Sequence, residues 1–598
     1  MWSSKTIAAL LGAVSLAFAV AACGSSESGS SGGSASAGSG LETGGYKSPL
    51  TESLTGGKKG GKLVALQETD FEHLDPGLSY YNLDYPVVFA TQRPLYSNKP
   101  NGEAEPTPDL ASGPPEISAD NKTITVHLRE GVKFSPPVNR EVTSADVAYA
   151  IERGANPNVA NPYVQAYFAA VEGMPKATGG PVKGIETPDK HTIVFHLDEP
   201  KAQIAADALV LPLSAPVPKE YAEKYDKHAP SEYASYEVAT GPYMIKNNAQ
   251  GKVLGVGYFP GKSLTLVRNP NWNASTDYRP AYLDEINYKI GGTITVIGKE
   301  TLQGTNVIAQ ERPAQATVQE AAEHYKSQLQ ISPGAGDHYI GVNNKVGPFK
   351  NADLRKALWA ALDREQMDKV RGGSLVTNVQ THFLFPGISG FEQAGGLKGP
   401  AGIPYNEHPQ GDMALAEKYI KEAGYPSGKY SGETITVVGA RGAPADLDSE
   451  IVNTTLQNLG FKTKLSLPES SISYSKYCNV PKEEITVCPD VGWIQDFADP
   501  QTVLNVTFNG RFIPPVGNVN WSQADNPHIN EMMDKAELIA GKSARANAWA
   551  KIDEEIVKEA LAIPFDWDKQ ANVEGKEVNG VGQLWNSGEW DLDYTSLK

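Results

Sequence analysis

Segments with strand-like and helix-like patterns alternate along most of this chain, and this alternation restricts the fold more than any other feature. Residues 123–128 (TITVHL) and 192–197 (TIVFHL) alternate their apolar side chains as half-buried strands do. Between them, residues 142–154 (VTSADVAYAIERG) predict a helix that begins at a capping box of Thr143 and Asp146 and ends at a glycine. Such alternation is typical of α/β domains with mixed sheets.

The second half of the chain continues the pattern. An amphipathic helix is predicted over 351–373, because Leu354, Leu358 and Leu362 fall on one face and Gly372 can end it. Further helices are predicted at 413–425, 447–461 and 529–561, and further strands at 262–269, 433–440 and 562–568. The folded body is therefore expected to be α/β from about Lys62 onward.

The length of 598 residues exceeds what a single core normally supports, so two or three domains are expected. Apolar residues make up 40% and charged residues 21% of the chain, as in ordinary soluble proteins. The net charge of −17 argues against a nucleic-acid partner, which would require a basic face.

The N-terminus predicts export. Lys5 precedes a short apolar run that ends in small residues before Cys23, which fits a signal peptide over 1–22. The sequence VAAC resembles a bacterial lipobox, in which the cysteine becomes the acylated N-terminus; the alternative is a plain signal peptide with an incidental cysteine. Residues 23–61 are rich in Gly and Ser and predict a flexible tether between a lipid anchor and the folded body.

Two cysteines remain, Cys478 and Cys488. In an exported chain their proximity predicts one disulfide, with two free thiols as the alternative. A metal site is not expected, because the pair offers only two ligands and no histidine lies near it.

No local motif predicts catalysis or a cofactor. The chain has no HExxH, no nucleophile elbow, no paired CxxC and no GxGxxG that opens a helix. Residues 255–263 (GVGYFPGKS) resemble a phosphate-binding loop, but Val256 occupies the position of the first required glycine and a strand follows. No catalytic set, cofactor or metal is therefore predicted from local motifs.

One short stretch raises a specific question. Residues 491–500 (VGWIQDFADP) place large apolar side chains around Asp496. Burying a carboxylate among such groups is costly unless a cation or a hydrogen-bond donor meets it. The stretch itself does not identify that partner of Asp496.

Several longer blocks resemble the peptide/nickel-type (family 5) solute-binding proteins of bacterial ABC importers. The blocks occur in the order of that family, at 108–153, 239–245, 264–272, 352–367, 416–425, 492–500 and 563–568. Two stretches depart from the family pattern. Residues 135–141 (SPPVNRE) lack the usual glycine, and residues 291–325 fit poorly.

The resemblance implies an α/β, bilobed fold of the periplasmic-binding-protein type II, with mixed sheets and a hinge between the lobes. It assigns 62–97, 213–337 and 568–598 to lobe I, 98–212 to an inserted subdomain and 338–567 to lobe II. The two chain crossovers at 338–344 and 562–568 would form the hinge.

The resemblance also implies a ligand site. Asp496 corresponds to the aspartate that accepts the free α-ammonium of a peptide, with Trp493 beside it in the cleft. Tyr80, Tyr81 and Asn82 would form a second wall whose backbone pairs with an extended peptide; the alternative is that both tyrosines are core aromatics. Arg441 is the candidate for the ligand carboxylate, and its alternative is a solvated loop arginine.

The function implied is capture of peptides with a free amine and delivery to the permease subunits of an ABC importer. The protein would be an extracytoplasmic monomer, anchored to the outer face of the cell membrane by lipid on Cys23. A nickel chelate, a sugar or another small solute as ligand, a sensory receptor and a surface enzyme are the alternatives.

Overall fold

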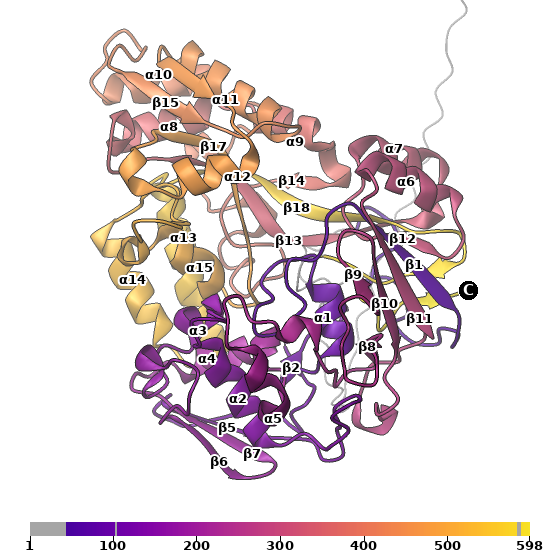
Figure 1. The fold of residues 1–598 in the computed structure, drawn as a ribbon. Coiled ribbons are helices and arrows are strands. Elements are labelled where there is room, and N and C mark those ends of the chain that lie inside the picture. Colours follow the sequence, from indigo (N-terminus) through magenta and orange to yellow (C-terminus); the bar gives the residue numbers. More distant parts are fainter. Residues whose placement is uncertain (1–42, 102–104, 583–587) are drawn as a thin grey trace, which may run out of the picture. The chain divides into compact units, whose positions relative to one another are not determined.

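The computed structural model describes residues 43–101, 105–582 and 588–598 (Figure 1). The predicted signal peptide over 1–22 and the predicted lipidation site Cys23 lie outside the described residues. Within the part of the chain that is described, no helix has the length and apolar character that crossing a membrane requires.

Three sheets organise the described body. The first has the order β12-β1-β11-β10-β8, with β9 paired to β10; its strands are β1 (Lys62–Gln67), β8 (Tyr243–Ile245), β9 (Tyr258–Phe259), β10 (Ser263–Arg268), β11 (Glu285–Ile290) and β12 (Val307–Ala309). The second has the order β14-β18-β13-β17-β15-β16; its strands are β13 (Leu329–Val342), β14 (Thr377–Val379), β15 (Thr434–Val438), β16 (Lys462–Ser466), β17 (Val487–Ile494) and β18 (Ile563–Val573). The third has the order β4-β5-β7-β6, formed by β4 (Glu116–Ile117), β5 (Thr123–His127), β6 (Ile185–Asp189) and β7 (Thr192–His196).

The first two sheets are mixed, as the sequence predicts. Strand β1 runs parallel to β11 and β12, whereas β10 runs antiparallel to β11. Strand β15 runs parallel to β16, whereas β13 runs antiparallel to β17 and β18. Two short pairs complete the strands of the described residues: β2 (Tyr96–Ser97) with β3 (Thr107–Pro108), and β19 (Val578–Asn579) with β20 (Ser596–Leu597).

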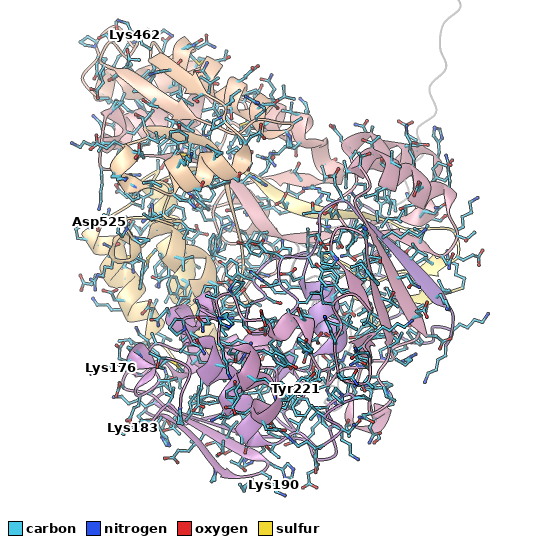
Figure 2. The ribbon with its side chains drawn as sticks, viewed as in Figure 1. Lys176, Lys183, Lys190, Tyr221, Lys462 and Asp525 are labelled. Atoms are coloured by element: carbon cyan, nitrogen blue, oxygen red, sulfur yellow. A yellow bond between two sulfur atoms is a disulfide. The ribbon has the colours of Figure 1, made fainter. Side chains whose placement is uncertain are left out.

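Helices accompany these sheets. The N-terminal half contains α1 (Tyr85–Thr91), α2 (Ser144–Gly154), α3 (Pro162–Tyr167), α4 (Ala202–Asp207), α5 (Lys219–Ala222), α6 (Ile294–Gln303) and α7 (Gln315–His324). The C-terminal half contains α8 (Ala352–Ala361), α9 (Arg364–Arg371), α10 (Met413–Glu422), α11 (Ala445–Asn458), α12 (Ser470–Ser473), α13 (Gln501–Phe508), α14 (Pro527–Glu537) and α15 (Lys542–Lys558). Charged side chains such as Lys183, Lys190 and Lys462 point away from the body into solvent (Figure 2).

Strands β13 and β18 each contribute to two hydrophobic cores. Leu329 of β13 and Val573 of β18 pack with residues of the first sheet, including Leu66. Further along the same strands, Ile340 and Phe565 belong to the core around the second sheet. The predicted crossovers at 338–344 and 562–568 thus overlap the strands β13 and β18, which contribute to both cores. The lobe boundaries stay a prediction.

Helix ends follow local chemistry. The capping box of α2 is present, with Thr143 and Asp146 in the predicted roles. The single helix predicted over 351–373 is wrong, because it breaks at Leu362 into α8 and α9. Asp363 causes the second start: its carboxylate accepts a hydrogen bond from the Gln366 backbone at 2.8 Å, as an N-cap does. The helix predicted over 529–561 is likewise two helices, α14 and α15.

The predicted disulfide between Cys478 and Cys488 is present. Cys488 lies in β17, which also carries Trp493. The bridge therefore ties the turn before β17 to the strand that leads to Asp496.

The predicted flexible tether requires a correction, because its described part, residues 43–61, contacts the body. Lys47 pairs with Gln330 of β13 through its backbone, and its Nζ lies 2.9 Å from Oε1 of Glu574, whose side chain is 0% exposed. Lys58 pairs with Leu597. A buried carboxylate needs a counter-ion, and Lys47 supplies it from far along the sequence. Composition alone could not reveal that partner.

Candidate functional site

Asp496 follows the end of β17 and meets a hydroxyl group. Its Oδ2 accepts a hydrogen bond from the hydroxyl of Tyr167, the last residue of α3. Within the described residues, no cationic side chain forms an ion pair with Asp496, and its Oδ1 accepts no hydrogen bond. Burial raises the pKa of Asp496 to about 7, while the hydrogen bond from Tyr167 lowers it. The carboxylate thus still lacks a cationic partner.

A cavity of about 410 Å³ lies beside Asp496. Its walls come from three parts of the chain: the segment after β1, Tyr163 of α3, and the end of β17 with the residues that follow it. The lining includes Tyr80, Tyr81, Asn82, Trp493 and Asp496. The structure therefore brings together five of the six ligand-binding residues predicted from the sequence.

The wall formed by residues 79–85 is fixed by hydrogen bonds within the loop. The carboxylate of Asp84 accepts hydrogen bonds from the backbone of Glu72 at 3.0 Å and of His73 at 3.1 Å. Burial nevertheless raises the pKa of Asp84 to about 7. At the start of the loop, Asp75 pairs with the buried Arg153 at 2.6 Å. These contacts hold the wall in a defined conformation.

Tyr80 and Tyr81 occupy different environments. Tyr80 is half-buried and packs on Tyr163, with ring centroids 5.2 Å apart. Tyr81 is 48% exposed and meets Tyr80 edge to face, with centroids 5.7 Å apart. Tyr81 is therefore not a core aromatic, whereas Tyr80 both packs against the core and lines the cavity.

Trp493 is held by contacts to two neighbouring elements. Its backbone N–H donates to Asp337 of β13 at 3.1 Å, and its indole Nε1 donates to the carbonyl of Thr502 at 2.7 Å. Gln380 also donates to Asp337, at 2.8 Å. The position of Trp493 thus depends on strand β13, one of the two strands shared by both cores.

Arg441 does not lie with the other predicted site residues. Its side chain is 69% exposed and pairs with Glu469 at 3.2 Å, and it lines neither of the two described cavities that contain Asp496. The structure places it on the surface, as a solvated loop arginine would be.

The sequence analysis missed the tyrosines of α3. Tyr163 and Tyr167 stack with centroids 6.1 Å apart, and the hydroxyls of Tyr163 and Tyr85 lie 2.6 Å apart. Tyr80 packs on Tyr163, so Tyr80, Tyr163 and Tyr167 form a continuous aromatic cluster that contacts Asp496 through Tyr167. Their spacing of four residues, which places both on one helix face, is the signal that could have identified them.

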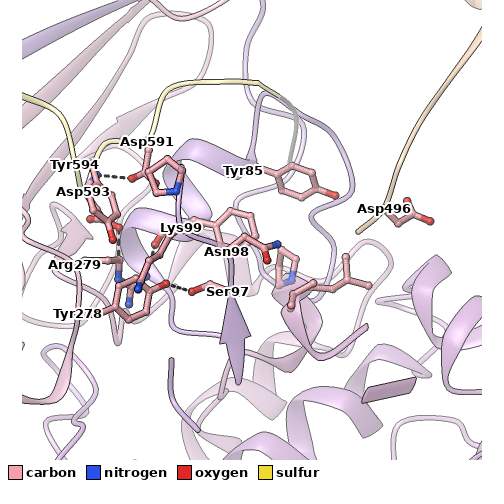
Figure 3. Close-up of a pocket in the computed structure, with 15 residues that line it drawn as sticks. Tyr85, Ser97, Asn98, Lys99, Tyr278, Arg279, Asp496, Asp591, Asp593 and Tyr594 are labelled. Carbon is pink, nitrogen blue, oxygen red and sulfur yellow. Dashed lines mark hydrogen bonds and ion pairs between the residues drawn. The ribbon is translucent and has the colours of Figure 1, made fainter. Parts of the chain in front are cut away.

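A second cavity, of about 40 Å³, also has Asp496 in its lining (Figure 3). Tyr85 and Lys99 contribute to its lining. The ammonium of Lys99 lies 6.0 Å from the centre of the Tyr278 ring, and within the described part of the chain it forms no ion pair. Arg279, which also lines this cavity, already forms an ion pair with Asp109 at 3.1 Å. Asp496 thus borders two cavities.

Mixed sheets, two strands shared by both cores and a cavity beside Asp496 are the features that a comparison with known proteins has to match. The family model of the bacterial extracellular solute-binding proteins, family 5 (middle), matches residues 105–513, which is more than half of the chain. The chain belongs to this family, whose bilobed fold agrees with the several mixed sheets observed.

Relatives and solved structures agree with this membership. The chain is 23% identical to the periplasmic oligopeptide-binding protein OppA of Salmonella typhimurium, over 80% of this chain and 82% of that protein. The structure of the clavulanic acid biosynthesis oligopeptide binding protein 2 matches with a TM-score of 0.77 and 24% identity, over 90% of this chain and 96% of that one. The periplasmic binding protein DppA of Helicobacter pylori, in complex with the peptide STSA, matches with a TM-score of 0.69 and 21% identity, over 90% and 98% of the two chains.

Proposed function

We propose that the protein captures peptides with a free N-terminal amine in the cavity beside Asp496 and delivers them to an ABC importer. The observation that carries the proposal is the state of Asp496. The carboxylate is partly buried, is held on one oxygen by Tyr167 and has no cationic partner within the described residues. A peptide α-ammonium supplies the missing charge in a charge-assisted hydrogen bond.

The remaining predicted residues take roles around that bond. The backbones of residues 80–85 and 492–496 border the cavity from two sides, so an extended peptide can pair with main chain and be bound largely independently of its sequence. Trp493 and Tyr81 offer aromatic faces to the ligand. Arg441 stands apart from the cavity. Lys99, which lines the smaller second cavity that Asp496 also borders, replaces it in this proposal as the cation for a peptide carboxylate.

The cellular setting proposed is that of an extracytoplasmic lipoprotein. Lipid on Cys23 holds the protein at the outer face of the membrane, and the permease subunits of the importer are its partner. The family description as extracellular and the OppA relatives support this setting. The protein acts as a monomer without cofactor or metal.

Native mass spectrometry of the purified full-length protein tests the ligand class. A series of co-purifying peptide masses is expected. Calorimetry on dialysed protein then compares one such peptide with its N-acetylated form, which should bind much more weakly. Failure of every free-amine peptide to bind, together with a co-purified sugar or metal chelate, would overturn the proposal.

A further inference from the structure

The cavity beside Asp496 has an excess of negative charge. Besides Asp496, its lining includes Asp70, Glu72 and Asp84. None of the described residues that line it is a lysine, an arginine or a histidine. One peptide α-ammonium would neutralise only one of these four carboxylates.

Two of the three further carboxylates accept hydrogen bonds from neutral donors. Asp70 accepts hydrogen bonds from the backbones of Phe71 at 2.9 Å and Gly261 at 2.6 Å, and Asp84 accepts two from the backbone. Glu72 is exposed, and within the described residues its carboxylate forms no hydrogen bond or ion pair. Burial is the main cause of the raised pKa of Asp84, and the negative charges of Glu72 and Asp70 raise it further. A bound cation would relieve this repulsion.

Two tyrosine rings lie among these carboxylates. Burial raises the pKa of both phenols, and nearby charges raise it further: Asp496 at Tyr80, and Glu72 and Asp84 at Tyr81. Tyr80 and Tyr81 meet edge to face, and both line the cavity together with the carboxylates. Carboxylates next to exposed aromatic faces favour guanidinium and ammonium groups through ion pairs and cation–π contacts.

We propose that this cavity selects peptides that carry arginine or lysine at one of their first two positions. The inference rests on the proposed function, because it takes Asp496 as the partner of the α-ammonium. The side chain of the first or second residue then runs along Tyr80 and Tyr81, and its cationic end reaches Glu72. Glu72 is the contact that distinguishes a cationic side chain from a neutral one of the same shape.

The test compares two tetrapeptides with free amines by calorimetry on the full-length protein. One begins with arginine and the other with citrulline, which keeps the shape of arginine and loses its charge. We expect the arginine peptide to bind about 2- to 5-fold more tightly, as for an ion pair with an exposed carboxylate. The preference should weaken in high salt.

Two variants locate the contact. Glu72→Gln should bring the ratio of the two affinities close to one. Glu300→Gln is the matched control: Glu300 is an exposed glutamate of α6 that lines none of the described cavities, and the ratio should be unchanged.

The outcomes separate this inference from the proposed function. Equal binding of the arginine and citrulline peptides would overturn the selectivity and leave peptide capture standing. If Glu72→Gln kept the wild-type ratio of affinities for the arginine and citrulline peptides, the role assigned to Glu72 would be overturned. Binding of neither peptide, nor of any other free-amine peptide, would instead overturn the proposed function.

Discussion

The hydroxyl of Tyr167 donates a hydrogen bond to the carboxylate of Asp496, although the two residues are 329 positions apart in the sequence. The contact joins the end of helix α3 to the segment that follows strand β17. It satisfies one carboxylate oxygen with a neutral donor and leaves the charge uncompensated. A site prepared in this way favours a cationic ligand.

Asp496→Asn should lower the affinity for a free-amine peptide by roughly 30- to 3000-fold, since losing one partner of a buried charge pair costs about 2–5 kcal/mol. The substitution keeps the shape of the side chain and removes its charge. Calorimetry measures four affinities, those of the wild type and of Asp496→Asn for the free and the N-acetylated form of one peptide. The substitution should lower the affinity for the acetylated form much less than the affinity for the free form. If Asp496 only shapes the turn before Pro500, asparagine will leave all four affinities nearly equal.

Peptide affinity should depend on pH through Asp496. Its pKa is about 7 without ligand, and only the ionised carboxylate attracts an ammonium, so affinity should fall as the pH drops below about 7. Above about pH 8 the peptide amine loses its proton, and affinity should fall again. Titrations from about pH 5.5 to 9 should thus show an affinity maximum between the two limits. The fall of affinity on the acid side of this maximum, the acid limb, should be absent in Asp496→Asn.

Tyr167→Phe should move the acid limb to higher pH. The hydrogen bond from Tyr167 lowers the pKa of Asp496, so its removal raises that pKa further. Affinity at pH 7 should then fall, and it should recover in part at higher pH. An acid limb at the same pH as in the wild type would show that Tyr167 does not tune Asp496.

Removal of the disulfide should destabilise the protein. The cysteines are 10 residues apart, and closing a loop of that size contributes about 2–3 kcal/mol in the chain-entropy view. Denaturant unfolding of the Cys478→Ala/Cys488→Ala double variant checks the magnitude. Alkylation of the native protein without reductant, followed by intact-mass measurement, should modify neither cysteine; two added alkyl groups would contradict the bridge.

Lys47→Met should lower the free energy of unfolding by about 2–3 kcal/mol, because the buried Glu574 loses its counter-ion. Adding Glu574→Gln should recover part of the loss, since no unpaired charge then remains. Lys59→Met is the matched control, because Lys59 is exposed and close by in the sequence. If residues 43–61 are a free tether, the Lys47→Met and Lys59→Met variants will have the same free energy of unfolding.

Cys23→Ser should release the protein from the membrane, because the acylated residue is lost. The released protein should unfold at the same denaturant concentration as the anchored one, since Cys23 precedes the folded body. Fractionation after a salt wash provides the measurement. Retention of the variant in the membrane fraction would contradict lipid anchoring at this residue.

Several features were determined by local sequence. Thr143 and Asp146 specify the start of α2 because a capping box needs only residues three apart. The disulfide followed from export and from the proximity of Cys478 and Cys488. Asp496 stood out because a carboxylate among large apolar residues is costly without a partner. The family blocks predicted the mixed α/β fold and the cavity residues near Asp496.

Other features were decided only by tertiary packing. The sequence did not reveal Tyr167 as the partner of Asp496, Lys47 as the counter-ion of Glu574, or the exposed position of Arg441. Each of the first two contacts joins residues more than 300 positions apart. A local pattern shows that a buried charge needs a partner, but which side chain reaches it depends on how distant segments pack, and that is fixed only when the whole chain folds.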